Sequence, residues 1–200
     1  MVEFLSLRQE MVDICKSAYT EHLFAGTSGN LSVYRREEGV MLVTPTCVRY
    51  ETMVAEDIVA IKLDGTQIDG RYAPSSEWRM HAAIYKGNEQ VNAVFHTHSP
   101  YATAFAVVRR DIPLILIEMI PFLGGHVPCS EFAQPGSWEL GASAVDALNK
   151  HTRNACLLAN HGVVAVGEDL AQAYIRAEYV EDAAVICHRA MQLGDITTIG

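Results

Sequence analysis

Hydrophobic and polar positions along the chain follow two periods, and segments with the two periods alternate. A period near 3.6 residues is typical of an amphipathic helix, while alternation or a short apolar run between turn residues is typical of a strand. We therefore expect helices over residues 7–22, 77–86, 100–108, 137–150 and 170–193. We expect strands over residues 31–34, 40–43, 58–63, 66–68, 91–95, 155–159 and 163–166, and one or two short strands within residues 112–120.

The order of these segments predicts the fold class. Helices are interleaved with strands, and some strands are joined by tight turn signals such as Asp64 and Gly65. Strands joined by such short connections pair antiparallel. We predict an α/β protein, a three-layer sandwich with a central mixed, largely antiparallel sheet flanked by helices. Because no internal repeat, low-complexity segment or linker interrupts the pattern, we expect residues 1–200 to form a single domain.

Composition limits the classes of partner. The formal net charge of −9 argues against a general affinity for nucleic acid or anionic membranes, which need basic surfaces. The longest apolar stretch, residues 114–123, is too short to span a bilayer, and the first residues lack the pattern of a secretory signal. The five cysteines are scattered without a C-x-x-C pair, which is typical of reduced thiols. We therefore expect a cytoplasmic protein with no nucleic-acid partner and no membrane partner.

Two histidines at the end of an apolar run indicate a metal site. Because side chains alternate along a strand, His96 and His98 point the same way. His161 follows a second apolar strand and precedes Gly162. Three imidazoles with an open coordination position are the ligand set of a catalytic zinc, with iron, cobalt or manganese as alternatives. The alternative interpretation of His161 is a turn residue before a glycine.

A glutamate and several hydroxyl groups are the other candidates for chemistry. Glu77 follows Ser75 and Ser76 at a predicted helix start, where we expect a serine as the N-cap and Glu77 in the first turn. Free amides and hydroxyls at a helix N-terminus bind anions. Residues 29–30 and Thr46 lie in two further polar loops, so the three segments together predict a phosphate site. Glu77 is the candidate acid/base, and the alternative is that it only complements the helix dipole.

The remaining histidines are not expected to bind metal. His81 lies four residues after Glu77 on the same helical face, and we expect a structural role for it, the alternative being a hydrogen bond inside the site. We expect no ligand role for the other four, which are His22, His126, His151 and His188.

These separate motifs occur in the order found in the class II aldolase/adducin family, which the chain resembles over essentially its whole length. The motifs are residues 26–32, 44–46, 74–81, 96–98 and 160–162. The sequence Ser75-Ser76-Glu77, followed by Trp78, is similar to the one found in the branch of the family that acts on L-fuculose 1-phosphate. The family's L-ribulose-5-phosphate 4-epimerases usually carry aspartate where Glu77 stands. Adducin-type members lose the metal histidines, which this chain keeps.

The resemblance implies a zinc-dependent aldolase and a set of site residues. It implies one Zn²⁺ per subunit, held by His96, His98 and His161. It implies that Glu77 is the proton donor and acceptor and can also occupy the free position on the metal. It implies a phosphate site formed by Gly29, Asn30, Thr46, Cys47, Ser75 and Ser76.

The resemblance also implies a substrate class and an assembly. The substrate is a small phosphorylated sugar, a ketose 1-phosphate that is cleaved reversibly to dihydroxyacetone phosphate and an aldehyde through a metal-stabilised enediolate. L-Fuculose 1-phosphate and related deoxyketose 1-phosphates are the candidates. The family is typically a homotetramer with active sites at subunit interfaces. The alternatives are a pentulose-5-phosphate 4-epimerase, another family lyase such as a decarboxylase or dehydratase, and a non-enzymatic interaction module of the adducin type.

Three departures from the family pattern concern the edges of this site. Cys47 stands where the family usually has glycine. Glu118 aligns with a tyrosine that serves in proton relay in the aldolase, which makes it a candidate catalytic base for the C4 hydroxyl. The family's C-terminal tail, which carries another tyrosine, would lie beyond Gly200.

Overall fold

The computed structural model describes residues 4–199. Its helices are α1 (Leu5–Thr20), α2 (Trp78–Gly87), α3 (Pro100–Val107), α4 (Met119–Leu123), α5 (Trp138–His151) and α6 (Leu170–Leu193), with 3₁₀ turns η1 (Tyr50–Thr52) and η2 (Ala55–Asp57). Its strands are β1 (Asn30–Arg35), β2 (Val40–Val43), β3 (Val59–Ile61), β4 (Gln67–Asp69), β5 (Ala93–Thr97), β6 (Ala155–Leu158) and β7 (Gly162–Gly167). Each of these strands and five of the six helices match an expected segment.

The strands of the described residues form a seven-stranded sheet in the order β4-β3-β2-β1-β5-β7-β6. Neighbouring strands are antiparallel throughout. The parallel component of the predicted mixed sheet is reduced to one isolated bridge between Cys129 and Leu157. At the end of β5, His96 stands between Asn30 of β1 and Val164 of β7. Segments far apart in the sequence therefore meet at this end of the sheet.

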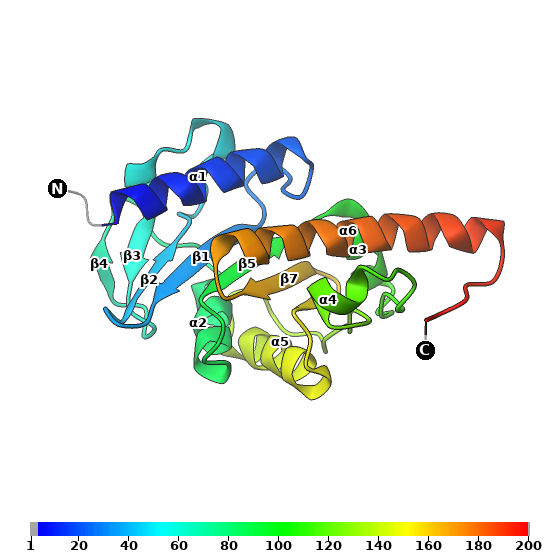
Figure 1. The fold of residues 1–200 in the computed structure, drawn as a ribbon. Helices are drawn as coiled ribbons and strands as arrows, with labels where there is room; N and C mark the ends of the chain where they lie inside the picture. Colours follow the sequence, from blue (N-terminus) through cyan, green and yellow to red (C-terminus); the bar gives the residue numbers. More distant parts are fainter. Residues whose placement is uncertain (1–3, 200) are drawn as a thin grey trace.

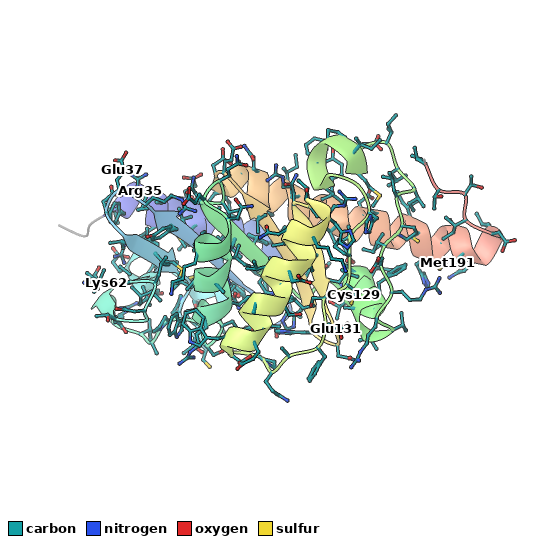
Figure 2. All side chains as sticks on the ribbon, turned by 90° about the horizontal axis from the view of Figure 1, so that it is seen from below. Arg35, Glu37, Lys62, Cys129, Glu131 and Met191 are labelled. Carbon is teal, nitrogen blue, oxygen red and sulfur yellow. The ribbon has the colours of Figure 1, made fainter. Side chains whose placement is uncertain are left out.

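Helices cover both faces of the sheet, which confirms the predicted three layers. In Figure 1, α1, α3, α4 and α6 lie on one face, and α2 and α5 lie on the other. Figure 2 shows this second face, where α2 and α5 cross the sheet side by side. Alternation along β5 sends Val94 into the α2–α5 core and Phe95 into the opposite core. By the same alternation the next residue, His96, points to the α2 side.

Local sequence signals explain where the two longest helices of the second half begin. The Asp169 side chain accepts a hydrogen bond of 2.8 Å from the Gln172 amide at the start of α6. Ser137 accepts one of 3.1 Å from the Leu140 amide at the start of α5. Both satisfy amides that a helix leaves without an internal partner, and both caps were expected from the sequence. Within residues 4–199, no helix is long and apolar enough to cross a membrane.

The strands expected within residues 112–120 are wrong. Only an isolated bridge pairs Ile112 with Val127, and the chain then forms the short helix α4 from Met119. The segment is rich in isoleucine and leucine, which favours a strand locally. In the structure the apolar residues of this segment pack instead against the core on the α6 side, with Met119 and Leu123 buried as side chains of α4.

Candidate active site

Two loops, one strand end and one helix start meet at one end of the sheet. His96 lies in β5, and His98 lies one residue beyond its end. His161 lies in the turn between β6 and β7, and Glu77 directly precedes α2. Each of these four residues offers a ligand atom, and these atoms all lie within 4.8 Å of one another. The structure thus brings together the four residues that were predicted as metal ligands.

The distances within this group, the His₃–Glu cluster, are those of ligands around a single ion. His96 Nε2 lies 3.0 Å from His98 Nε2 and 3.0 Å from Glu77 Oε2. His161 Nε2 lies 3.3 Å from Glu77 Oε1. In a tetrahedral site with bonds of about 2.0–2.1 Å, the ligand atoms are roughly 3.4 Å apart.

The hydrogen bonds of the cluster leave acceptor atoms facing one another, an arrangement that suits a bound cation. His96 Nδ1 donates to the Val163 carbonyl at 2.7 Å, which directs Nε2 of the ring towards the cluster. The Glu77 carboxylate is 6% exposed, and its Oε1 has no hydrogen-bond donor among the described residues. Acceptor atoms that face one another at these distances repel unless a proton or a metal ion lies between them. Neutral imidazoles and a carboxylate are ligands that suit a divalent transition metal.

Burial and neighbouring charge set the protonation of the cluster. Burial lowers the pKa of His98 and the pKa of His161 to about 4 each, which keeps these rings neutral at neutral pH. Burial alone would raise the pKa of Glu77. The His96 and His161 rings and a hydrogen bond from Asn30 outweigh burial and hold the pKa of Glu77 well below its ordinary value. Glu77 is therefore a carboxylate, the form that binds a cation or accepts a proton.

Two glycines are needed where backbones approach the cluster. A Cβ on Gly162 would lie 2.3 Å from the Thr97 carbonyl oxygen and 3.2 Å from His96 Cε1. A Cβ on Gly29 would lie 2.9 Å from the His96 carbonyl oxygen, and its φ of +85° is one that favours glycine. Only a residue without a side chain lets β1 and β7 approach β5 at the histidine end.

The start of α2 differs from the expectation in one respect. Glu77 is itself the N-cap, with α2 beginning at Trp78, whereas a serine N-cap and a first-turn Glu77 were expected. A turn over residues 75–78, closed by the Trp78 amide and the Ser75 carbonyl at 3.1 Å, precedes the helix. The Ser75 hydroxyl accepts from the Glu77 amide at 3.3 Å. This turn directs the Glu77 carboxylate inward towards the histidines instead of along the helix surface.

The three loops predicted to bind phosphate lie beside one another. The Ser75 amide donates to the Thr44 carbonyl at 2.9 Å, and the Thr46 amide donates to the Ala73 carbonyl at 3.0 Å. The Thr44 hydroxyl accepts from the Leu31 amide at 3.2 Å and links the same loop to β1. Of the predicted phosphate residues, Ser76 and Cys47 are exposed, Thr46 and Gly29 are half-buried, and Ser75 and Asn30 are buried.

Cys47 adopts the backbone conformation of the residue that it replaces. Its φ is +58°, in the left-handed region that glycine occupies freely and other residues occupy at a cost. Its sulfur lies 3.6 Å from the Thr46 hydroxyl oxygen. The loop therefore keeps a glycine-like path while a thiol is added at its exposed surface.

Glu118 lies outside the His₃–Glu cluster. It is exposed and immediately precedes α4. This helix packs on α6 through the stacked rings of Phe122 and Tyr179, on the face of the sheet opposite α2. Within the part of the chain that the structure describes, Glu118 is not a member of the metal-ligating group.

Sequence reasoning allowed His81 a hydrogen bond inside the site but missed Ser32 and Tyr85, which join it near Asn30 and Glu77. Asn30 Nδ2 donates to Glu77 Oε2 at 3.0 Å, and the Asn30 side-chain oxygen contacts His81. His81 in turn contacts the Ser32 hydroxyl, which contacts Tyr85. The available signals were spacing by two along β1, from 30 to 32, and spacing by four along α2, from 77 to 81 and 85.

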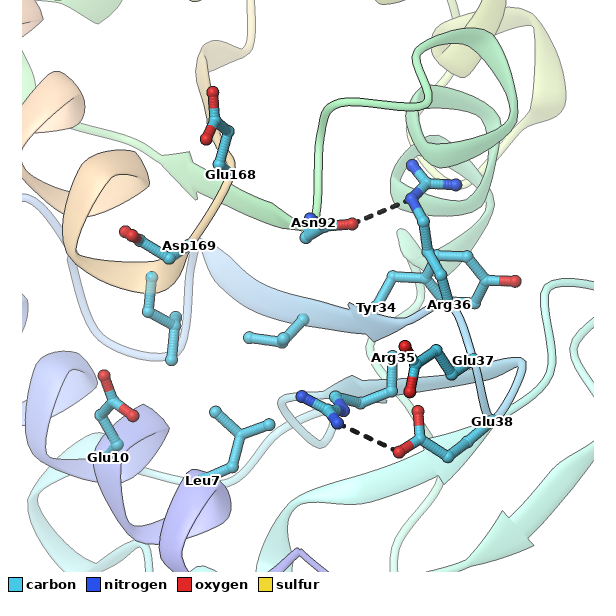
Figure 3. A pocket seen from close by; sticks show the side chains of 12 residues that line it. Leu7, Glu10, Tyr34, Arg35, Arg36, Glu37, Glu38, Asn92, Glu168 and Asp169 are labelled. Atoms are coloured by element: carbon cyan, nitrogen blue, oxygen red, sulfur yellow. Dashed lines mark hydrogen bonds and ion pairs between the residues drawn. The ribbon is translucent and has the colours of Figure 1, made fainter.

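A pocket of about 380 Å³ lies elsewhere, at the far end of β1 (Figure 3). It is lined in part by Arg35, Arg36, Glu38 and Asn92, which are joined by an Arg35–Glu38 ion pair and an Arg36–Asn92 hydrogen bond. At about 3.3 Å per residue, β1 separates Arg35 from Asn30 by roughly 17 Å. This pocket contains no member of the His₃–Glu cluster.

The fold and the cluster together define a class of protein, and comparison with known proteins specifies it. The sequence model of the family described as Class II Aldolase and Adducin N-terminal domain matches residues 9–188. This chain therefore belongs to the class II aldolase/adducin family, and within it to the class II metal-dependent aldolases of the fuculose-phosphate aldolase type.

Two curated relatives and one solved structure support this assignment. The 5-deoxy-D-ribulose 1-phosphate aldolase of Bacillus thuringiensis serovar kurstaki is 35% identical over 188 residues, which cover 94% of this chain and 87% of that protein. The L-fuculose phosphate aldolase of Escherichia coli K12 is 35% identical over 189 residues, which cover 94% of this chain and 86% of that protein. A solved structure of an L-fuculose 1-phosphate aldolase superposes with a TM-score of 0.93 at 34% identity, covering 100% of this chain and 92% of that one.

Proposed function

We propose that this chain cleaves a ketose 1-phosphate reversibly to dihydroxyacetone phosphate and an aldehyde, with one Zn²⁺ per subunit. The observation that carries the proposal is the convergence of three imidazoles and one carboxylate within 4.8 Å, beside loops rich in hydroxyls and amides. The preferred substrates are L-fuculose 1-phosphate and 5-deoxypentulose 1-phosphates. These correspond to the names of the two curated relatives.

His96, His98 and His161 would hold the ion, and Glu77 would fill its remaining position before substrate binds. Zinc is the preferred ion because three histidines and an exchangeable fourth position are its catalytic ligand set. When bound, such a cation supplies a Lewis acid that stabilises negative charge developing on the substrate oxygens.

Glu77 would carry the proton at C3 of dihydroxyacetone phosphate. In the cleavage direction it would deliver that proton after the C3–C4 bond breaks, and in the synthetic direction it would remove it. Because the pKa of Glu77 lies below its ordinary value, the group is ionised at neutral pH and has a free lone pair for a proton. Its position as the N-cap of α2 fixes Glu77 on a rigid element while leaving the adjoining Ser76 exposed.

The phosphate would lie on the three joined loops, held by groups of Gly29, Asn30, Thr46, Cys47, Ser75 and Ser76. None of these side chains is cationic, so main-chain amides and hydroxyls would provide the binding. Such a site suits a protein of net charge −9, which attracts anions only locally.

We further propose a single-domain subunit over residues 1–200 that assembles into a homotetramer in the cytoplasm. One continuous sheet and five free cysteines support the single domain and the reducing compartment. Glu118 is exposed on the opposite face from α2, so its proposed role as the C4-hydroxyl base requires the active site of a neighbouring subunit.

A panel of ketose 1-phosphates tests this function. Each substrate is incubated with the metal-loaded protein, and release of dihydroxyacetone phosphate is followed by its enzymatic reduction. We expect cleavage of at least one deoxyketose 1-phosphate, and loss of this activity on metal removal with recovery on addition of zinc. Interconversion of pentulose 5-phosphates without release of dihydroxyacetone phosphate would instead identify a 4-epimerase and reject the proposal.

A further inference from the structure

A chain of hydrogen-bonding groups leads from the core beneath α2 to Glu77. Asn30 Nδ2 lies 3.0 Å from Glu77 Oε2, and Asn30 Oδ1 contacts His81 Nε2. On the other side of the ring, His81 Nδ1 lies 2.6 Å from Ser32 Oγ. The Tyr85 hydroxyl lies 2.7 Å from Ser32 Oγ and 2.9 Å from the Ser32 carbonyl oxygen. We refer to Tyr85, Ser32, His81 and Asn30 as the donor chain.

The direction of each hydrogen bond in the donor chain follows from its last member. The Glu77 carboxylate only accepts, so Asn30 turns its NH₂ group to Glu77 and its carbonyl oxygen to His81. His81 must then carry its proton on Nε2, which leaves Nδ1 as an acceptor for the Ser32 hydroxyl. The Tyr85 hydroxyl donates to the Ser32 carbonyl oxygen and also contacts Ser32 Oγ. Ser32, His81 and Asn30 therefore each donate towards Glu77.

Burial makes this arrangement rigid. Asn30 is 4% exposed, Ser32 and His81 are 0% exposed and Tyr85 is 1% exposed, so solvent cannot replace a lost partner. Each buried polar group left without a partner costs about 1–3 kcal/mol. Burial also lowers the pKa of His81 to about 3, so the ring is neutral and has one donor and one acceptor.

The donor chain is built where a strand meets a helix. Asn30 and Ser32 are alternate residues of β1 and therefore face the same side of the sheet. His81 and Tyr85 follow Glu77 at intervals of four and lie on one face of α2. This geometry brings the two sets of side chains together without contributing any ligand to the cluster.

We propose that His81 is a positioning residue that orients Glu77 through Asn30, and that the Ser32 hydroxyl supports the Nε2-protonated tautomer of His81 by donating to Nδ1. The proposal deepens, and rests on, the proposed function in which Glu77 carries the C3 proton. With the opposite tautomer, Asn30 would turn its carbonyl oxygen towards the carboxylate, and the two acceptors would repel. A misplacement of the carboxylate by about 1 Å lowers the rate on the order of 100-fold.

The tautomer of His81 tests the geometry without requiring turnover. Protein with ¹⁵N-labelled histidine is loaded with zinc, and long-range ¹H–¹⁵N spectra report which ring nitrogen carries a proton. We expect a protonated Nε2 and an unprotonated Nδ1 at neutral pH, with the signals assigned by their loss in His81→Gln. A protonated Nδ1, or a doubly protonated ring, overturns the proposal whether or not the protein acts on any sugar phosphate.

Two matched variants test the effect on catalysis. His81→Leu removes the donor to Asn30, whereas His81→Gln places an amide donor near the original Nε2. For exchange of the C3 proton of dihydroxyacetone phosphate with solvent deuterium, we expect kcat to fall about 100-fold in His81→Leu, with KM and bound metal within about twofold. We expect His81→Gln to recover most of the loss. A wild-type rate in His81→Leu, or no recovery in His81→Gln, overturns the proposal.

Two further outcomes distinguish failure of this proposal from misfolding of a variant and from failure of the proposed function. If His81→Leu does not fold, Ser32→Ala takes its place. This change leaves His81 Nδ1 without its hydroxyl donor, and we expect a smaller population of the Nε2-protonated tautomer together with slower exchange. Unchanged tautomer and exchange in that variant would overturn the proposal. If the wild-type protein shows no exchange at all, the proposed function fails, while the wild-type tautomer still decides whether the donor chain has the stated direction.

Discussion

His161 Nε2 lies 3.3 Å from Glu77 Oε1. The two residues are far apart in the sequence, since His161 lies in the turn between β6 and β7 and Glu77 directly precedes α2. Among the described residues, neither Glu77 Oε1 nor His161 Nδ1 has a hydrogen-bond partner in the protein. Two buried polar atoms without partners are costly in a core. Of these two atoms, Glu77 Oε1 faces the histidines, whereas His161 Nδ1 is the ring nitrogen on the other side from Nε2. The unpartnered carboxylate oxygen indicates that the cluster binds a donor or cation that the protein itself does not provide.

Removal of one histidine ligand should remove the metal. We expect the purified wild-type protein to hold about one zinc or similar divalent ion per subunit, as in other sites of this ligand set. His96→Ala should hold well under half of that amount, because His96 is the ligand in contact with both His98 and Glu77. Elemental analysis after dialysis measures the content, with His188→Ala as the control for loss of an exposed histidine. A His96→Ala protein with full metal content would contradict the site.

Gly162 should tolerate no side chain. Gly162→Ala places a Cβ 2.3 Å from the Thr97 carbonyl oxygen and against the His96 ring, so β7 must move away from β5. We expect a loss of roughly 3 kcal/mol in the free energy of unfolding and weaker metal binding. Gly39→Ala is the matched control, because its Cβ meets nothing within 4 Å and only its φ of +67° carries a cost, about 1 kcal/mol. Equal losses in the two variants by denaturant unfolding would refute the steric account.

Cys47→Gly should relax the predicted phosphate loop. Because Cys47 has a φ of +58°, glycine should raise the free energy of unfolding by about 1 kcal/mol and lower KM for the phosphorylated substrate. Cys47→Ala separates the two causes, since it removes the thiol but keeps the backbone strain. If Cys47→Ala stabilises the protein as much as Cys47→Gly does, the thiol and not the backbone is responsible.

The metal-free protein should lose stability in mild acid. Burial lowers the pKa of His98 and of His161 to about 4 and that of His81 to about 3, whereas an unfolded histidine has a pKa of about 6.5. Between these values the unfolded chain binds more protons than the folded chain, so stability rises with pH from about 4 to 6.5 and is lost as pH falls through that window. Thermal unfolding across pH 4–8 measures this effect.

The control for this pH dependence is His81→Gln, which removes one titrating group. Its stability should fall less steeply with acid than that of the wild-type protein. A wild-type melting temperature that stays constant between pH 6.5 and 4.5 would contradict the neutral, buried state of these histidines.

The sequence predicted the layers of the fold and the histidines of the His₃–Glu cluster for the same reason. Hydrophobic periodicity identified strands, and His96, His98 and His161 stand at or just beyond strand ends, where loops converge. Residues 112–120 were mistaken for strands because a local apolar run does not distinguish a paired strand from a loop and short helix that pack on the core.

The hydrogen-bonding partners of Asn30 and Glu77 could not be predicted in the same way. His81 and Ser32 look individually like ordinary buried polar residues, and only the pairing of β1 with β5 beneath α2 brings them together. The inward turn of Glu77 likewise depends on the hydrogen bonds of Ser75, which leave no distinct pattern in the sequence.

The exchange of the C3 proton of dihydroxyacetone phosphate by Glu77→Gln tests the central claim most directly. Glutamine keeps the shape of Glu77 but cannot accept the proton, and general-base catalysis is worth about 10²–10⁴ in rate. We predict that Glu77→Gln retains its metal, measured on the same sample, while exchange with solvent deuterium falls about 1000-fold. Exchange within about tenfold of the wild-type rate, with metal still bound, would contradict Glu77 as the group that carries the proton.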